Sequence, residues 1–150
     1  LNSKKPDGLI LSGGPSSVYA KNAPTVDKSI FDVGVPILGI CYGQQLMAYE
    51  LGGKVKHSKK HEYGPAAVKL TKASKIFSGL KKTQQVWMSH GDSVMSPPQG
   101  FVTNAITKTI PVAAMTDENA TNVTNPQNTN CPKFSTMIDS GWESGITVAS

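Results

Sequence analysis

A single stretch, GVPILGICYGQQLMAYELGG at 34–53, constrains the fold more than any other part of the sequence. Its first half contains VPILGI, a continuous apolar run that predicts a buried strand. In its second half Met47 and Leu51 lie four residues apart and two glycines follow, which predicts a helix and its end. Cys41 stands at the junction between two glycines. The sequence therefore predicts a strand that turns sharply into a helix at a thiol.

The preceding sequence predicts a second unit of the same kind. GLILSGGP at 8–15 is a short apolar run stopped by glycines and a proline, the pattern of a buried strand that leads into a tight loop. In the segment APTVDKSIFDVGVP, Val26, Ile30 and Val33 fall at helical spacing and Gly34 ends the pattern, so a helix is expected. Strand, helix, strand and helix in this order predict an α/β fold, with a mostly parallel sheet flanked by helices.

The rest of the chain is less regular. Short strands are expected in AAVKLTK, QQVWMSH, GFVTNA and PVAAMT, which turn residues separate. The lysine-rich run KVKHSKKH at 54–61 is expected to form a solvated hairpin or loop. From Thr116 to Asn130, nine of fifteen residues are Asn or Thr, so this segment buries too little apolar surface to order itself. We expect one domain at 1–115 and a low-complexity tail, disordered or frameshifted, at 116–150.

Composition and charge narrow the classes of function. The net charge is +5, but all fifteen basic residues are lysines, and arginine is the side chain that most often reads guanine and phosphate. A nucleic-acid partner is therefore not expected. The sequence contains no apolar run long enough to cross a bilayer, so a membrane partner is not expected either. Two cysteines, Cys41 and Cys131, do not make a secreted disulfide scaffold, which favours a reducing, cytoplasmic location.

The segment G-I-C-Y-G at 39–43 has the pattern of a nucleophile elbow, a sharp strand-to-helix turn that pushes its central side chain out of the sheet. A thiol at the amino end of a helix faces unpaired N–H groups and the positive end of the helix dipole. Both favour a thiolate and can stabilise an oxyanion beside it. An isolated cysteine is more often a packing residue, but the strand before Cys41 and the helix after it favour a nucleophile.

Three motifs in order, ILSGGPSSVY, GVPILGICYGQQLMAYELGG and VWMSHGDSV, resemble those of class I glutamine amidotransferase domains, most closely the GMP synthase type. The resemblance runs from about Gly8 to about Met115. It implies hydrolysis of glutamine to glutamate and ammonia through a cysteine thioester. It also implies an ATP-pyrophosphatase or synthetase domain or subunit, which would use ATP, Mg and the ammonia to aminate XMP. No cofactor or metal is implied within the domain itself.

The same resemblance implies roles for individual residues. Cys41 matches the nucleophile, and the backbone N–H groups of Gly14 and Tyr42 match the donors to the oxyanion. The positions that hold the amino and carboxylate groups of glutamine, partly through backbone atoms, are matched by Gln45, Ser89, Gly91 and Asp92.

Two parts of the family pattern find no counterpart in this sequence, so we expect a fold truncated at both ends. The first strand and helix of the family have no match before Leu1. The family's catalytic histidine and glutamate, in a late F-H-P-E stretch, have no match either, and the three histidines present, His57, His61 and His90, lie upstream. General acid–base catalysis is typically worth about 100- to 10,000-fold in rate. Little or no glutaminase activity is therefore expected from this chain, and reading the encoding DNA in the other frames would test a frameshift.

Several alternatives stay open on the sequence alone. The chain could be a catalytically dead copy that binds glutamine or a synthetase, or another cysteine-elbow branch of the fold, related to proteases or chaperones. SGGPSS resembles a pyrophosphate-binding loop, but Ser16 stands where that loop has an aspartate. His57 and His61 would share a metal only on a helix, which the surrounding glycines and lysines disfavour. His90 is the one candidate stand-in for the missing base, but the family pattern favours a loop residue that shapes the glutamine pocket. Asp92 near it suggests a Cys, His, Asp triad, although with one residue between them the two side chains would point apart in a strand unless a loop relaxes this.

Overall fold

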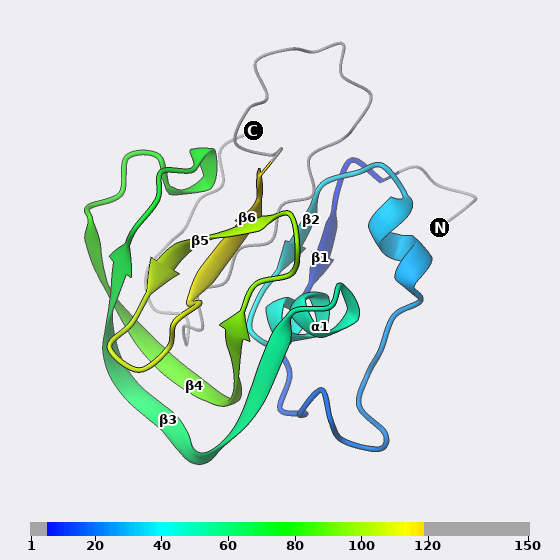
Figure 1. Cartoon of the computed structure of the whole chain (residues 1–150), viewed down its shortest axis with the longest axis horizontal. Helices are drawn as coiled ribbons and strands as arrows, with labels where there is room; N and C mark the ends of the chain where they lie inside the picture. Colours follow the sequence, from blue (N-terminus) through cyan, green and yellow to red (C-terminus); the bar gives the residue numbers. More distant parts are fainter. Residues whose placement is uncertain (1–5, 119–150) are drawn as a thin grey trace.

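The structure is a computed structural model that describes residues 6–118 and, within them, the side chains of all residues except 58–63 and 90. Two sheets, one α-helix and two short 3-10 helices make up this part of the chain (Figure 1). In chain order the elements are β1 (Leu9–Leu11), η1 (Lys28–Asp32), β2 (Ile37–Gly39), α1 (Tyr42–Glu50), β3 (Lys54–Leu70), η2 (Lys75–Phe77), β4 (Thr83–Ser96), β5 (Phe101–Ile106) and β6 (Ala114–Asp117).

The two sheets differ in direction. β1 and β2 form a parallel pair in which Leu9 lies opposite Ile37. The larger sheet is antiparallel, with strand order β4-β3-β5-β6, and its long β3–β4 ribbon is strongly bent (Figure 1). Helix α1 contacts β1 and β2 on one side and β3 and β4 on the other. This single helix therefore joins the two sheets.

The predicted fold class was only partly correct. A mostly parallel sheet flanked by helices was expected, but the described residues form a mostly antiparallel sheet, a two-stranded parallel pair and one α-helix. The helix expected around Val26, Ile30 and Val33 shortens to η1. Asp27 caps η1 by accepting from the Ser29 N–H, and the hydrogen bonds from Ser29 hold the pKa of the Asp27 carboxyl below its usual range. Val33 is the C-cap of η1, and Gly34, at a φ of 77°, follows it, so the end of the element is where the sequence predicted it and the expected helix is shortened at its start.

The lysine-rich run at 54–61 was also predicted wrongly, because it is the first half of strand β3 and neither a hairpin nor a loop. Its backbone pairs with β4, with Lys54 opposite Ser96 and His57 opposite Asp92. Val55 is buried between the exposed Lys54 and Lys56, the alternation of a strand with one face in solvent. The lysines thus stay hydrated without breaking the strand.

Other expected elements are confirmed. The two apolar runs form β1 and β2, and the pattern after Cys41 forms α1. The four short strands expected downstream lie in β3, β4, β5 and β6, in that order. Residues 116–118 of the expected tail belong to the end of this fold, because β6 runs to Asp117 and the Glu118 N–H donates to the Gly100 carbonyl. The remainder of that expected tail, 119–150, lies outside the described residues.

The core is built around α1. Its buried Leu46 and Ala48 pack with side chains of the antiparallel sheet, whereas Met47 packs with Phe31 and Ile37 beside the parallel pair. A further cluster, which includes Val68, Phe77 and Met88, fills the far part of the larger sheet. Within the described residues, the helices are all too short or too polar to span a bilayer.

Two glycines let α1 approach the parallel pair. A Cβ on Gly43 would lie 2.0 Å from the carbonyl oxygen of Leu11, and one on Gly39 would lie 2.9 Å from the backbone nitrogen of Gln44. Such distances are far below van der Waals contact, so only glycine fits at these positions without backbone movement. The sequence pattern G-x-C-x-G is therefore a packing requirement of the strand-to-helix turn.

We expect Gly43→Ala to destabilise the fold although alanine is the better helix former by about 1 kcal/mol. The added methyl group must push α1 away from β1, and such overpacking should lower the free energy of unfolding by about 2 kcal/mol or more. Urea denaturation measures this change. Gly8→Ala is the matched control, because its Cβ would meet only the Pro36 carbonyl at 3.4 Å. Equal stability of the two variants would contradict the close approach.

Tyr42 gives a second, pH-dependent prediction. Its buried hydroxyl donates to the carbonyl oxygen of Pro24, and burial, with smaller contributions from Asp92 and Glu50, raises the pKa of this phenol. Because the folded state favours the neutral phenol, its contribution to stability is present below pH 10 and is lost as the pH rises through the raised pKa.

We therefore expect Tyr42→Phe to cost about 1 kcal/mol at pH 8 and to make the alkaline fall in unfolding free energy shallower. Chemical denaturation between pH 8 and pH 11 provides the measurement. Tyr49→Phe serves as the control, since the Tyr49 ring is exposed and packs edge-on against Tyr19. If both substitutions changed the unfolding free energy by the same amount at every pH, the alkaline fall could not be assigned to Tyr42.

Candidate functional site

Cys41 occupies the sharp turn between β2 and α1. Its backbone has φ 56° and ψ −115°, and among residues 6–118 no other residue except glycine has a positive φ. The turn is fixed on both sides: the Ile40 N–H donates to the Leu11 carbonyl, and the N–H groups of Gln44 and Gln45 donate to the Cys41 carbonyl. A residue held in this sparsely populated region costs about 1–3 kcal/mol. The fold thus spends stability to place this thiol at the amino end of α1.

The glycine loop after β1 lies directly against this thiol. A Cβ on Gly13 would be 3.0 Å from the Cys41 Cβ and 3.7 Å from its Sγ. A Cβ on Gly14 would be 3.9 Å from the Tyr42 Cβ. The structure therefore brings together Cys41, Gly14 and Tyr42, the three residues for which the sequence predicted nucleophile and oxyanion roles. The Cys41 side chain is half-buried between the loop and the helix.

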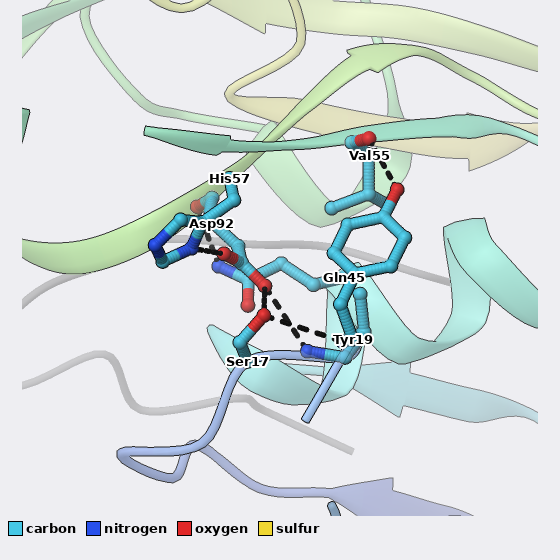
Figure 2. A network of polar contacts seen from close by, with 7 residues as sticks. Ser17, Tyr19, Gln45, Val55, His57 and Asp92 are labelled. Carbon is cyan, nitrogen blue, oxygen red and sulfur yellow. Dashed lines mark hydrogen bonds and ion pairs between the residues drawn. The ribbon is translucent and has the colours of Figure 1, made fainter. Parts of the chain in front are cut away.

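A second polar group centres on Asp92 of β4 (Figure 2). One carboxylate oxygen, Oδ2, accepts from the Ser17 hydroxyl at 2.7 Å and from the Val18 N–H at 3.0 Å. The other, Oδ1, lies 2.6 Å from Nδ1 of His57. The Asp92 side chain is only 1% exposed, whereas that of His57 is 56% exposed. A buried carboxylate is stable when donors satisfy it in this way.

The predicted substrate-binding residues are partly brought together. Gln45 of α1, 4% exposed, donates its side-chain amide to the backbone carbonyl of Asp92 at 2.8 Å. Ser89 and Gly91 lie on the same strand as Asp92, Ser89 exposed and Gly91 half-buried. These contacts attach α1 to β4 beside the loop that covers Cys41. They also show that the Asp92 carboxylate is already occupied within the protein.

Sequence reasoning missed the roles of Ser17 and His57. His57 was weighed only as a metal ligand with His61, but it lies on a strand and faces Asp92 across the ribbon. In the part of the chain that the structure describes, no three His, Cys, Asp or Glu side chains gather as metal ligands do. The contact between His57 and Asp92 could have been predicted by aligning KVKH with HGD as paired strands. It was missed because 54–61 was expected to be a hairpin or loop.

The set Ser17, Asp92 and His57 has the composition of a catalytic triad but the wrong order. In a triad the histidine bonds to the nucleophile and the carboxylate bonds to the histidine. Here Asp92 lies in the middle, bonded to Ser17 on one side and His57 on the other. The histidine cannot take the proton from Ser17, so these contacts are structural. The side chain of His90, the other candidate base, lies outside the described residues.

Comparison with known proteins gives the family. The family profile of class I glutamine amidotransferases matches residues 1–124. A glutamine-hydrolysing GMP synthase from Geobacillus kaustophilus is 53% identical over 118 residues, which are 79% of this chain and 22% of that protein. The corresponding enzyme of Clostridium perfringens is 50% identical over 118 residues, or 79% of this chain and 23% of that protein. The chain thus spans less than a quarter of the length of these curated relatives.

The fold comparison agrees with the sequence comparison. A solved glutamine amidotransferase from Thermotoga maritima, 18% identical, matches 87% of this chain and 54% of its own length with a TM-score of 0.61. This similarity shows that the chain shares its overall fold with that protein. On the profile match and the relatives above, the chain belongs to the class I glutamine amidotransferase family.

Proposed function

We propose that this chain is the glutamine-hydrolysing part of a GMP synthase, and that Cys41 is its nucleophile. The observation that carries the proposal is the backbone of Cys41, whose φ of 56° presents the thiol at the start of α1 against the Gly13–Gly14 loop. A non-glycine residue held in such a conformation needs a reason, and exposing a nucleophile is one that fits this turn. The names of the relatives, glutamine-hydrolysing GMP synthases, agree with this chemistry.

The proposed reaction begins when the Cys41 thiolate attacks the side-chain amide carbon of glutamine. A tetrahedral oxyanion forms, to which the backbone N–H groups of Gly14 and Tyr42 donate. When it collapses, the carbon–nitrogen bond breaks, ammonia leaves with an added proton, and a glutamyl thioester remains on Cys41. Water then hydrolyses the thioester to glutamate and returns the thiol. The amino end of α1 favours the thiolate through its N–H groups and its dipole.

Substrate orientation is assigned to residues on α1 and β4. Gln45, Ser89 and Gly91 would hold the amino and carboxylate groups of glutamine, in part through backbone atoms. The contact between Gln45 and the Asp92 carbonyl supports this arrangement, because it fixes α1 to the strand that carries Ser89 and Gly91. Asp92 is buried and would support this group by accepting the Gln45 amide at its backbone carbonyl.

The partner follows from the proposed product. Ammonia released at Cys41 would serve an ATP-pyrophosphatase or synthetase domain or subunit, which would bind ATP and Mg and aminate XMP. The relatives are more than four times as long as the matched segment, which leaves room for such a domain in them. A cytoplasmic location fits a chain with a reactive thiol, since thiols stay reduced there.

Two alternatives carry different expectations. A catalytically dead copy would bind glutamine without releasing ammonia. A protease-like or chaperone-like member of the fold would present a reactive Cys41 that does not recognise glutamine. Selective labelling and an ammonia assay separate all three.

We expect a chloroketone analogue of glutamine to label Cys41 at least about tenfold faster than iodoacetamide does, because binding brings the electrophile to the thiol. Alkylation by a chloroketone needs no general acid, so the missing family histidine does not prevent it. Intact-mass spectrometry measures the rates. Cys131→Ser leaves Cys41 as the single thiol, and Cys41→Ser in turn leaves only Cys131.

Excess L-glutamine should slow this labelling, and D-glutamine should not. Labelling of Cys41 by iodoacetamide alone, with no preference for the glutamine analogue, would favour the protease-like or chaperone-like alternative. If both single-thiol variants were labelled at the same rate, the assignment of Cys41 as the nucleophile would be rejected.

We also expect the 150-residue polypeptide by itself to release ammonia slowly. The F-H-P-E stretch of the family has no counterpart in its sequence, and His57 is bonded to Asp92. Without proton transfer, its rate should lie about 100- to 10,000-fold below that of a full-length relative assayed beside it. A coupled ammonia assay measures the rate, with Cys41→Ser as background. Ammonia release as fast as the relative's would refute this expectation.

A further inference from the structure

We infer that His57 and Asp92 form a clamp that holds the loop at 12–19 over Cys41, and that both are positioning residues of the amidotransferase site. The inference goes beyond the substrate role that the family resemblance implied for Asp92. It also assigns a positioning role to His57, a residue to which the family resemblance gave no role. Its consequence for chemistry rests on the proposed function, whereas the clamp itself is a property of the fold.

The first step concerns the Asp92 carboxylate. Both of its oxygens accept hydrogen bonds from inside the protein, from Ser17 and Val18 on one side and from His57 on the other. With 1% of the side chain exposed, little of it remains for the amino group of a substrate. Asp92 therefore acts on the site through the groups that it holds.

The second step concerns what the carboxylate holds. Ser17 and Val18 lie at the end of the glycine loop, and the Ser17 hydroxyl also accepts from the Tyr19 N–H. Tyr19 in turn donates its hydroxyl to the carbonyl oxygen of Val55 on β3 (Figure 2). Thus the end of the loop is bonded to both strands of the β3–β4 ribbon.

The third step is the short connection to the thiol. Only Pro15 and Ser16 separate Gly14 from Ser17, and Gly13 lies against the Cys41 side chain. A connection of two residues has little slack, so movement at Ser17 and Val18 passes to the N–H of Gly14. Oxyanion donors act only when their geometry is preorganised. The clamp would therefore set the position of the Gly14 donor.

His57 is the part of the clamp best suited to a test. It faces Asp92 across the register of β3 and β4, and its Nδ1 is the partner of Oδ1. Because an ionised carboxylate only accepts, Nδ1 is the donor in this contact. The side chain is 56% exposed, so its replacement leaves the core intact. Removing it should loosen the Asp92 carboxylate without unfolding the chain.

The first arm of the experiment measures the loop directly. In His57→Ala, we expect amide hydrogen exchange at Val18 and Tyr19, followed by NMR, to accelerate about tenfold, as expected when one charge-assisted hydrogen bond is lost. Exchange in β5 and β6 should stay unchanged. His57→Asn should restore slow exchange, because its side-chain amide can reach the place of Nδ1. Lys56→Ala, at the neighbouring exposed position of β3, is the matched control.

The second arm measures the consequence at Cys41 in the Cys131→Ser background. We expect His57→Ala to lower the ratio of labelling by the glutamine chloroketone to labelling by iodoacetamide about tenfold, since misplaced donors and pocket groups weaken recognition. His57→Asn should bring the ratio back to near that of the parent. A residue with a merely structural role would change the melting temperature and leave this ratio unaltered.

The two arms distinguish two kinds of failure. Unchanged exchange at Val18 and Tyr19 in His57→Ala would overturn the clamp, whatever the labelling shows. Faster exchange with an unchanged labelling ratio would overturn the positioning role. If the parent protein shows no preference for the glutamine reagent, the proposed function fails, and the exchange arm still decides whether the clamp exists.

Discussion

The close contact between the first turn of α1 and the end of β1 is the constraint on which the rest of the structure depends. Because Gly43 has no side chain, α1 can lie against the Leu11 carbonyl, and the strand before it must turn sharply to reach that position. The turn forces Cys41 into its positive φ and directs its thiol toward the glycine loop. The same helix contacts both sheets, so the geometry of one turn also sets how the antiparallel ribbon meets the parallel pair.

The β3–β4 ribbon holds the glycine loop and α1 from the other side of the site. Asp92 on β4 bonds the end of the glycine loop through its carboxylate and receives the amide of Gln45 at its carbonyl. The loop, the helix and the ribbon therefore meet at one buried residue, Asp92. Chemistry at Cys41 would depend on residues that never touch the substrate, because donors to an oxyanion are useful only when they are held in place.

How much the sequence could predict depended on how local the determining interactions are. The elbow at Cys41 was predictable because its pattern reflects contacts within a few residues of it, and the approach of the SGGP loop came with the family resemblance. The antiparallel nature of the larger sheet was not predicted, because β3 and β4 pair residues that lie far apart in the sequence, as with Lys54 and Ser96. Lysines at 54–61 concealed β3 because a strand with one solvated face tolerates charge. The contact between His57 and Asp92 was missed for the same reason.

The backbone of Cys41 has a consequence for how such a chain can change. Glycine adopts its φ without penalty, so a chain selected only to fold well would gain by replacing this cysteine with glycine. On the proposed function, a cysteine kept here despite that gain reflects selection for reactivity. Loss of the thiol to glycine, with the flanking glycines intact, would be the expected signature of a descendant that has abandoned chemistry and kept its shape.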